Sequence, residues 1–311
     1  MERSENPESG YKEQFYDSKS FKEIKVQGNS TAMTIAWARW EESQKPKDER
    51  ICYDPYAVRF ISPDALEWAA QNPDKVKLVR EQRDHVLPGI QNSIVARVRF
   101  FDDFVESSLA NGLHQLVILG AGYDTRAHRM GGLKRIRVFE VDHPGTQEMK
   151  IEMVKKIFGH LSDHVVYVPV DLTTEDLSFK LLENGYDKSK RTLFLMEGLL
   201  YYLSPSVVDE VLSFIVRSSC KGSSILFDYF PPSLTEGNGE AGRFLKISLE
   251  KSGTPLQFGL EERMVETFLT HRGYSKVHNV TSEDYKRAYF HGVNEGRIVS
   301  RLLNFAHAVI E

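Results

Sequence analysis

Short apolar segments that alternate with helix-like segments limit the fold of this chain more than any other feature. The first, over residues 116–119, is closed by Gly120-Ala121-Gly122, a turn typical of a buried strand that leads into a helix. Further strands are predicted over 137–141, 165–170, 192–196 and 224–227. Helices are predicted between them, over 125–130, 145–158, 174–184 and 205–218. This alternation predicts an α/β fold with a parallel sheet and helices on both of its faces.

The segments before the first strand predict a polar tail and a helical lid. Residues 1–20 are polar and mixed in charge, and we expect them to form the tail. Helices are expected over 29–40, 63–70 and 91–109, the last with an apolar stripe at three- and four-residue spacing. Residues 21–112 would then supply a lid over the ligand and the first helix of the fold, although the same pattern also fits plain core helices.

The segments after the fifth strand complete a single domain over 21–311. A helix is expected near 261–271, followed by strands over 276–280 and 304–310. Glycines and prolines over 231–242 predict a flexible loop beside the ligand pocket. Residues 113–311 would thus form a Rossmann-like core that carries substrate-pocket insertions.

Charge and composition exclude several classes of partner. The chain has a formal net charge of -4 at pH 7, so no basic excess is available to neutralise the phosphates of a nucleic acid. No apolar run approaches the roughly 20 residues that span a bilayer, and the first residues lack the apolar stretch of a signal peptide. Cys52 and Cys220 lie far apart, which argues against a disulfide framework or a thiolate zinc site. We therefore expect a cytoplasmic protein that acts without nucleic acid or membrane.

The glycine turn after the first predicted strand is a candidate ligand site. Gly120 and Gly122 permit a tight turn and a close approach of a ligand to the backbone, with Ala121 between them. The dinucleotide pattern G-x-G-x-x-G would place a third glycine at the position of Thr125. A nucleoside ligand without a pyrophosphate therefore suits this turn better, although a plain strand-to-helix turn also accounts for it.

Carboxylates follow the next two predicted strands, at the edge where such sheets bind ligands. Glu140 and Asp142 close the second strand, and either one could accept from a pair of ribose hydroxyls. Asp171 ends the third strand and could accept from an adenine amine while the N–H of Leu172 donates to a ring nitrogen. The competing interpretation of this segment is a helix cap, with Thr173 as the capping residue.

Glu197 and Arg97 are the candidate charges for an amino-acid-like ligand. Glu197 follows the fourth strand, where a carboxylate is costly to bury without a partner. A ligand ammonium would supply that partner, and a protein arginine or lysine would do so equally. Arg97 lies beside the apolar stripe of its helix and could pair bidentately with a ligand carboxylate, and Arg99 is the alternative. Either arginine could instead lie at the surface with its stem packed on Phe100 or Phe101.

Five segments with these residues resemble the leucine carboxyl methyltransferase-like family, in particular its bacterial branch of S-adenosylmethionine-dependent or polyketide O-methyltransferases. The segments are ARVRFFDDF at 96–104, LGAGYDTRA at 119–127, EVDHPGTQ at 140–147, VDL at 170–172 and MEGLLYYL at 196–203. Because they occur in order and at matching spacing, the set is far more specific than any single motif.

The resemblance implies a class I methyltransferase sheet with an antiparallel last strand and S-adenosyl-L-methionine as the cofactor. The roles that it implies are the cofactor carboxylate for Arg97, the methionine part for Gly120, the ribose for Asp142, the adenine for Asp171 and Leu172, and the amino-acid end for Glu197. It thereby favours Asp142 over Glu140. The segments before 90 and after 230 match less distinctively, so the family's protein-carboxylate substrate is not carried over.

The predicted reaction is O-methylation of a small-molecule carboxylate or acidic hydroxyl. A sulfonium methyl is already activated, so the enzyme must mainly align the acceptor and exclude water, and positioning can contribute on the order of 7–11 kcal/mol. Tyr201, Tyr202, Asp228 and Tyr229 follow the fourth and fifth strands, where the methyl group should point. The sequence identifies no catalytic base.

The histidines predict neither a metal site nor a firm catalytic role. His160 and His164 are four residues apart, but Gly159 should end the preceding helix before them, and no glutamate lies between them. His128 and His143 lie near the glycine turn and the end of the second strand. Either could act as a base, but a structural role is favoured for both.

Two rival functions are considered beside methyl transfer. An NAD(P)-dependent oxidoreductase could use a similar sheet with a catalytic Tyr/Lys pair, and Tyr186 and Lys190 have the required spacing, although in a polar loop. A cofactor-binding module without turnover would carry the same ligand-holding residues. The sequence indicates no oligomeric state.

Overall fold

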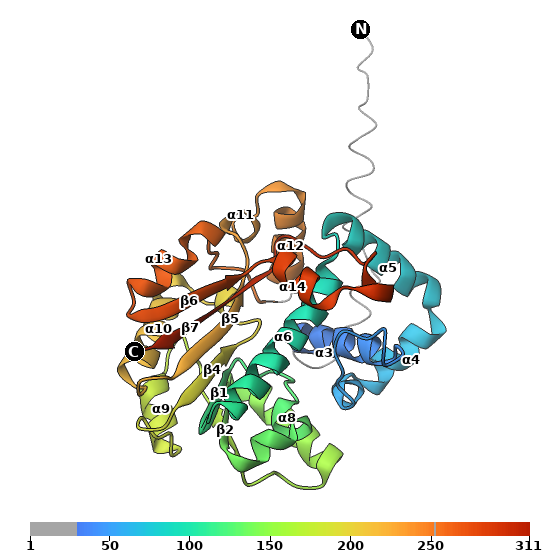
Figure 1. The fold of residues 1–311 in the computed structure, drawn as a ribbon. Coiled ribbons are helices and arrows are strands. Elements are labelled where there is room, and N and C mark those ends of the chain that lie inside the picture. Colours follow the sequence, from blue (N-terminus) through green and yellow to red (C-terminus); the bar gives the residue numbers. More distant parts are fainter. Residues whose placement is uncertain (1–29, 252) are drawn as a thin grey trace.

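The computed structural model describes residues 30–251 and 253–311, so the predicted tail lies outside the described residues. Within these ranges, seven strands form one sheet in the order β3-β2-β1-β4-β5-β7-β6 (Figure 1). They are β1 (Gln115–Leu119), β2 (Arg137–Asp142), β3 (Val165–Pro169), β4 (Thr192–Met196), β5 (Ser224–Tyr229), β6 (Tyr274–Val280) and β7 (Asn304–Ile310). Strands β1 to β5 are parallel, and β7 is antiparallel to both β5 and β6. The predicted sheet with an antiparallel last strand is confirmed.

The parallel register brings the carboxyl ends of neighbouring strands to one edge of the sheet. Leu119 pairs with Val141, and Asp142 pairs with Pro169. The strand order reverses at β1, because β2 lies on one side of it and β4 on the other. Ligands of α/β sheets bind beyond the carboxyl ends at such a switch point, and the turn over 120–122 lies there.

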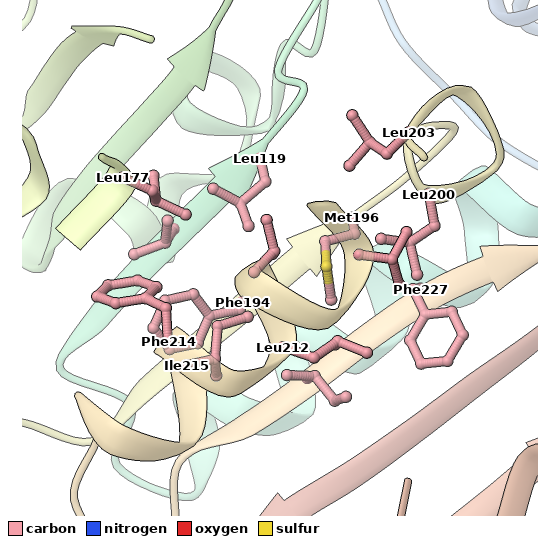
Figure 2. Close-up of a cluster of buried hydrophobic side chains, with 14 of the residues drawn as sticks. Leu119, Leu177, Phe194, Met196, Leu200, Leu203, Leu212, Phe214, Ile215 and Phe227 are labelled. Carbon is pink, nitrogen blue, oxygen red and sulfur yellow. The ribbon is translucent and has the colours of Figure 1, made fainter. Parts of the chain in front are cut away.

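One buried core lies between the sheet and two helices, α9 (Leu177–Glu183) and α10 (Pro205–Arg217). Phe194 of β4 and Leu212 of α10 belong to this core (Figure 2). Helix α10 begins as predicted, because the side chain of Ser204 accepts from a backbone N–H of the first turn. Burial of each large apolar side chain stabilises the fold by about 1.5–3 kcal/mol, so this packing holds α10 against the sheet.

A second core lies on the opposite face, beneath α6 (Ile90–Ala110). Phe101 and Val105 of α6 pack there with Ile118 of β1 and Leu195 of β4. Neighbouring strand residues point to opposite faces, so Leu119 and Phe194 enter one core while Ile118 and Leu195 enter the other. A sheet that is apolar on both faces needs helices on both faces, as the sequence predicts.

Shorter elements precede α6 in the chain. They are α3 (Ser30–Ser43), the 3-10 turn η1 (Ala57–Phe60), α4 (Pro63–Gln71) and α5 (Pro73–Val86). Figure 1 shows α3, α4 and α5 together beside α6, away from α9 and α10. The sequence did not predict α5, because this helix is rich in charge and contains no buried residue that would mark an apolar stripe.

The predicted flexible loop over 231–242 is wrong. This segment contains all of α11 (Pro232–Thr235) and the first residues of α12 (Gly239–Lys251). Gly237 and Gly239 have φ angles of 80° and 68°, so these glycines form the tight turn between the two helices. The glycine and proline content therefore marks the ends of short helices.

The remaining elements are short helices, 3-10 turns and one longer helix. They are α7 (Arg126–Arg129), η2 (Gly131–Arg135), α8 (Pro144–Phe158), η3 (Leu200–Tyr202), η4 (Glu262–Met264), α13 (Val265–Thr270), α14 (Ser282–Tyr289) and η5 (Gly292–Asn294). The sequence missed α14, although Thr281 and Asp284 form a capping box at its start. Among the described residues, no helix combines the length and the apolar character needed to cross a bilayer.

Candidate functional site

The turn after β1 has a backbone that glycine allows. Gly120 and Gly122 have φ angles of 67° and 44°, in the left-handed region. A Cβ atom at Gly120 would lie 2.9 Å from Cδ1 of Leu199, so a side chain there would also require Leu199 to shift. The N–H of Ala121 donates to the carbonyl of Val141 at 3.0 Å. The turn is thus fixed to the end of β2.

The two carboxylates of β2 have different environments. Glu140 is fully buried, and its Oε2 lies 2.7 Å from Nζ of Lys150. Burial raises the pKa of Glu140 to about 7, against the opposing charge of Lys150. Asp142 is only half-buried, and its Oδ2 accepts from the N–H of Gly122 at 2.5 Å while its Oδ1 accepts from the N–H of His143 at 2.7 Å. The structure therefore makes Glu140 a structural residue and leaves Asp142 at the open edge.

Asp171 lies beside Asp142, since the N–H of Val170 donates to the Asp142 carbonyl at 2.8 Å. Oδ1 of Asp171 accepts from the hydroxyl of Thr173 at 2.6 Å and from its N–H at 2.9 Å, and these bonds lower the pKa of Asp171. The prediction that Thr173 caps the next helix is wrong, because the side chain of Asp176 caps α9. Asp171 instead shapes the turn before that cap.

Leu172, the neighbour of Asp171, is half-buried. Its side chain packs against the core beneath α10. This packing holds the backbone of the turn after β3 while the carboxylate of Asp171 stays outside.

Arg97 is only 2% exposed and is held by two carboxylates. Its Nε donates to Oε1 of Glu197 at 3.1 Å, and its Nη1 donates to Oδ2 of Asp228 at 2.6 Å. Although burial opposes the charge, Asp228 and Glu197 raise the pKa of Arg97 above its usual range. Arg99 pairs with Asp103 at the surface, as predicted for the alternative arginine.

Arg126 is the site residue that the sequence analysis missed. It is 2% exposed, and its Nη1 contacts Oε2 of Glu197 at 2.6 Å and Oδ2 of Asp124 at 2.5 Å. Its Nε donates to Oδ1 of Asp102 at 2.7 Å. Glu197 therefore has two arginine partners, the alternative to a ligand ammonium that the sequence left open. The segment LGAGYDTRA contains Arg126, but its spacing alone gives no sign of burial.

The residues after β4 and at the end of β5 divide into two groups. The hydroxyl of Tyr201 accepts from Arg97 at 3.3 Å, and the ring of Tyr202 lies 4.8 Å from that of Tyr201. Asp228 is fully buried between Arg97 and the N–H of Gly198, which donates to its Oδ1 at 2.6 Å. Tyr229 is turned away, with its hydroxyl donating to Asn279 at 2.7 Å. The first group thus faces the edge that carries Arg97.

Both candidate histidines have structural contacts. The Nδ1 atom of His143 accepts from the N–H of Gly145 and caps α8. His128 stacks on Phe158 with ring centroids 4.8 Å apart, and burial lowers its pKa to about 4. These contacts fit the structural interpretation that the sequence favours for both histidines. Within the part of the chain that the structure describes, no group of three or more metal-binding side chains is found.

The sheet order, the antiparallel β7 and the glycine turn at the switch point define a class I methyltransferase fold. The crystal structure of a protein from Thermobifida fusca, described provisionally as a methyltransferase, has the same fold. Its TM-score is 0.56 at 16% identity, and the match covers 76% of this chain and 88% of that one.

Residues 32–216 match the family model described as leucine carboxyl methyltransferase. A Mycolicibacterium smegmatis protein with the provisional name S-adenosyl-L-methionine-dependent methyltransferase is 30% identical over 250 residues, which cover 79% of this chain and 81% of that protein. A Bacillus subtilis protein with the same provisional name is 27% identical over 257 residues, which cover 81% and 82%.

This chain belongs to the leucine carboxyl methyltransferase family, as its motifs predict. It is an S-adenosylmethionine-dependent methyltransferase, and S-adenosyl-L-methionine is its cofactor.

Proposed function

We propose that this enzyme methylates an oxygen atom of a small-molecule carboxylate or acidic hydroxyl. The observation that carries the proposal is that the acidic groups near Arg97 are already engaged. Asp228 accepts from Arg97 and from the N–H of Gly198, and the two oxygens of Glu197 contact Arg97 and Arg126. Because the oxygens of both carboxylates already accept from protein groups, we expect neither to serve as the base, and an acceptor that is already ionised, or easily ionised, fits best.

The tyrosines of this edge support the same reaction. Burial raises the pKa of Tyr202 to about 12, and it raises the pKa of Tyr201 well above its ordinary value. Neutral phenols donate hydrogen bonds but do not take up a proton at neutral pH. Tyr201 and Tyr202 would therefore orient an acceptor oxygen, and a carboxylate acceptor needs no further base.

We assign the nucleoside of the cofactor to the ends of β1, β2 and β3. Gly120 and Gly122 form a left-handed turn at this edge, and half-buried Asp142 lies next to them. Asp142 would accept from the ribose hydroxyls, while Asp171 and the N–H of Leu172 would hold the adenine. When bound, the cofactor supplies an activated methyl group.

We assign the amino-acid end of the cofactor to Arg97 and Glu197. Among the described residues, Glu197 accepts from Nε of Arg97 and Asp228 accepts from its Nη1. The raised pKa of Arg97 keeps its guanidinium charged, so it can pair with the carboxylate of the cofactor. Each oxygen of Glu197 has a second lone pair that could accept from the cofactor ammonium. Arg126 holds Glu197 at 2.6 Å and would keep that carboxylate in place.

Two segments that flank the edge are proposed to enclose the acceptor. A Cβ atom at Gly122 would lie 3.5 Å from Cβ of Ala32, so α3 comes over the glycine turn in the manner of the predicted lid. On the other side, the N–H of Gln257 donates to the Tyr201 carbonyl at 2.7 Å, and the rings of Tyr201 and Phe230 lie 4.6 Å apart. We propose that the domain predicted over 21–311 acts as one methyltransferase unit with this enclosed pocket.

The residues of the rival oxidoreductase lie elsewhere. Tyr186 is buried, with its hydroxyl donating to the carbonyl of Ser218 at 2.9 Å, and Lys190 is exposed. Both precede β4 and so lie at the amino edge of the sheet, opposite the glycine turn. A Tyr/Lys pair at that edge would not reach a ligand held at the carboxyl edge.

Calorimetry and labelled methyl transfer test the proposal together. Purified protein is titrated with S-adenosylmethionine, S-adenosylhomocysteine and NADH, and then incubated with methyl-labelled donor and a panel of carboxylates, phenols, amines and thiols. We expect binding of the two adenosyl ligands and label that is released by mild base from esters, or retained in aryl ethers. Binding of NADH alone, or label found only on nitrogen or sulfur, would overturn the proposal.

A further inference from the structure

Thr125 is a residue to which the proposed reaction gives no role. It stands where the dinucleotide pattern has its third glycine, yet it is 1% exposed. Its hydroxyl donates to Oδ2 of Asp54 at 2.7 Å and accepts from Nε of Arg129 at 3.0 Å. A hydroxyl whose proton and lone pair are both engaged has a fixed orientation. Thr125 is thus a buried connection between the glycine turn and the segment over 30–60, which contains α3 and η1 and is called the N-terminal segment below.

Asp54 is the other end of this connection. Its Oδ1 accepts from the N–H groups of Tyr56 and Ala57 at 3.0 and 3.1 Å, and its Oδ2 lies 3.0 Å from Nε of Arg39. Asp54 is 1% exposed, and a carboxylate so deeply buried depends on its partners. It therefore fixes α3, the turn that begins η1 and Thr125 relative to one another.

A second contact reaches the glycine turn from the same segment. Nη2 of Arg39 donates to the carbonyl of Tyr123 at 2.5 Å. The ring of Tyr123 lies 5.3 Å from that of Phe60, in a small core that also includes Ala36. The N-terminal segment thus holds the backbone directly after Gly122 through Tyr123 and through Thr125.

We propose that Thr125 and Asp54 are positioning residues that hold the glycine turn in the conformation that receives the cofactor. The inference rests on the cofactor site proposed above. Gly120 and Gly122 give the turn a large conformational freedom, which a ligand would otherwise have to restrict on binding. Because preorganised sites avoid that cost, the hydrogen bond from Thr125 to Asp54 makes cofactor affinity depend on the N-terminal segment.

An isosteric substitution separates this role from packing. Thr125→Val keeps the shape of the side chain and removes its hydroxyl, whereas Thr125→Ser retains the hydroxyl and removes the methyl group. By calorimetry well below the melting temperature, we expect Thr125→Val to weaken S-adenosylhomocysteine binding by about tenfold or more, and Thr125→Ser by less than about threefold. Asp54→Asn, which keeps the size of the side chain, should also weaken binding and carries the comparison if Thr125→Val does not fold.

Thr192 offers a matched control at the opposite edge of the sheet. It is fully buried, its hydroxyl donates to the Lys190 carbonyl at 2.9 Å, and it accepts from Gln115 at 3.0 Å. Thr192→Val should lower the melting temperature without changing the affinity. Hydrogen exchange of the free protein should show faster exchange at Gly122 and Tyr123 in Thr125→Val only.

Three results would overturn the inference, and each points to a different cause. Unchanged affinity in both Thr125→Val and Asp54→Asn would remove the positioning role while leaving the cofactor site intact. Equal weakening by Thr192→Val would show that the loss reflects general stability. Absence of binding to the wild-type protein would instead overturn the cofactor site itself, and the inference with it.

Discussion

The two edges of the sheet bury their polar groups in different ways. At the carboxyl edge, Arg97 and Arg126 are each 2% exposed and are surrounded by carboxylates. At the amino edge, the buried groups are neutral: Gln115 donates to the hydroxyl of Thr192 at 3.0 Å, and the N–H of Thr192 donates to the hydroxyl of Ser223 at 3.1 Å. Neutral hydrogen bonds therefore suffice to close a sheet edge of this chain.

The difference indicates what the buried charges are for. Transfer of an ion into the protein interior costs several kcal/mol, which its partners offset only when the geometry is good. We infer that the charged network at the carboxyl edge serves the proposed ligand, since the amino edge shows that neutral hydrogen bonds can close a sheet edge. The four predictions below test this contrast, from the largest expected effect to the smallest.

Removal of one charge from the carboxyl edge should cost more stability than removal of a neutral group from the amino edge. Arg126→Met leaves Asp124 without its ion-pair partner and Glu197 with Arg97 alone, and we expect the free energy of unfolding to fall by about 3–5 kcal/mol. Gln115→Met should lower it by about 1–3 kcal/mol, because neutral groups lose their partners. Urea unfolding measures both, and an equal or smaller loss for Arg126→Met would contradict the contrast.

Arg97 should act on the amino-acid end of the cofactor alone. Arg97→Lys keeps the charge but loses the planar fork, and we expect about 10- to 100-fold weaker binding of S-adenosylhomocysteine. Binding of methylthioadenosine, which lacks the amino-acid end, should stay unchanged. Arg99→Lys is the control, since Arg99 pairs with Asp103 at the surface. Equal losses for the two ligands would place Arg97 elsewhere in the site.

Asp142 and Asp171 should act on the nucleoside. We expect Asp142→Ala to weaken S-adenosylhomocysteine and methylthioadenosine alike, by about tenfold, because a carboxylate that accepts from hydroxyls contributes about 1.5 kcal/mol or more. Asp171→Ala should have a smaller effect, since the carboxylate of Asp171 is less buried than that of Asp142. Melting temperatures measured alongside the titrations should stay close to that of the wild type. Unchanged affinity in both variants would remove the nucleoside placement.

The smallest effect concerns two histidines with lowered pKa values, one beyond the glycine turn and one on β7. Burial lowers the pKa of His128 and of His307 to about 4. Below pH 6.5 the unfolded chain binds protons that the folded chain does not bind until about pH 4, so stability should decrease as pH falls through this window. His128→Phe and His307→Phe keep an aromatic ring and should make urea unfolding less dependent on pH between 7 and 5. An unchanged pH dependence in the double variant would contradict the assignment.

Local patterns predicted the strands and the helix ends that depend on neighbouring residues. Strand β4 matches its predicted range, and Ser204 caps α10 as expected. The sequence did not predict the roles of Arg126 and Asp54, because a key partner of each comes from a distant segment: Glu197 for Arg126, and Thr125, 71 positions away, for Asp54. Helices α11 and α12 were mistaken for a loop, since glycine and proline mark helix ends as well as loops.

The sequence by itself determined the alternating sheet, the family and the carboxylates that follow each strand, because these depend on short-range periodicity and on motif order. Only the tertiary structure decided that Glu140 is buried against Lys150, that Glu197 has two arginine partners and that Thr125 is joined to Asp54. Burial and ion pairing arise between segments that the fold brings together, and a residue's neighbours in the chain do not specify them.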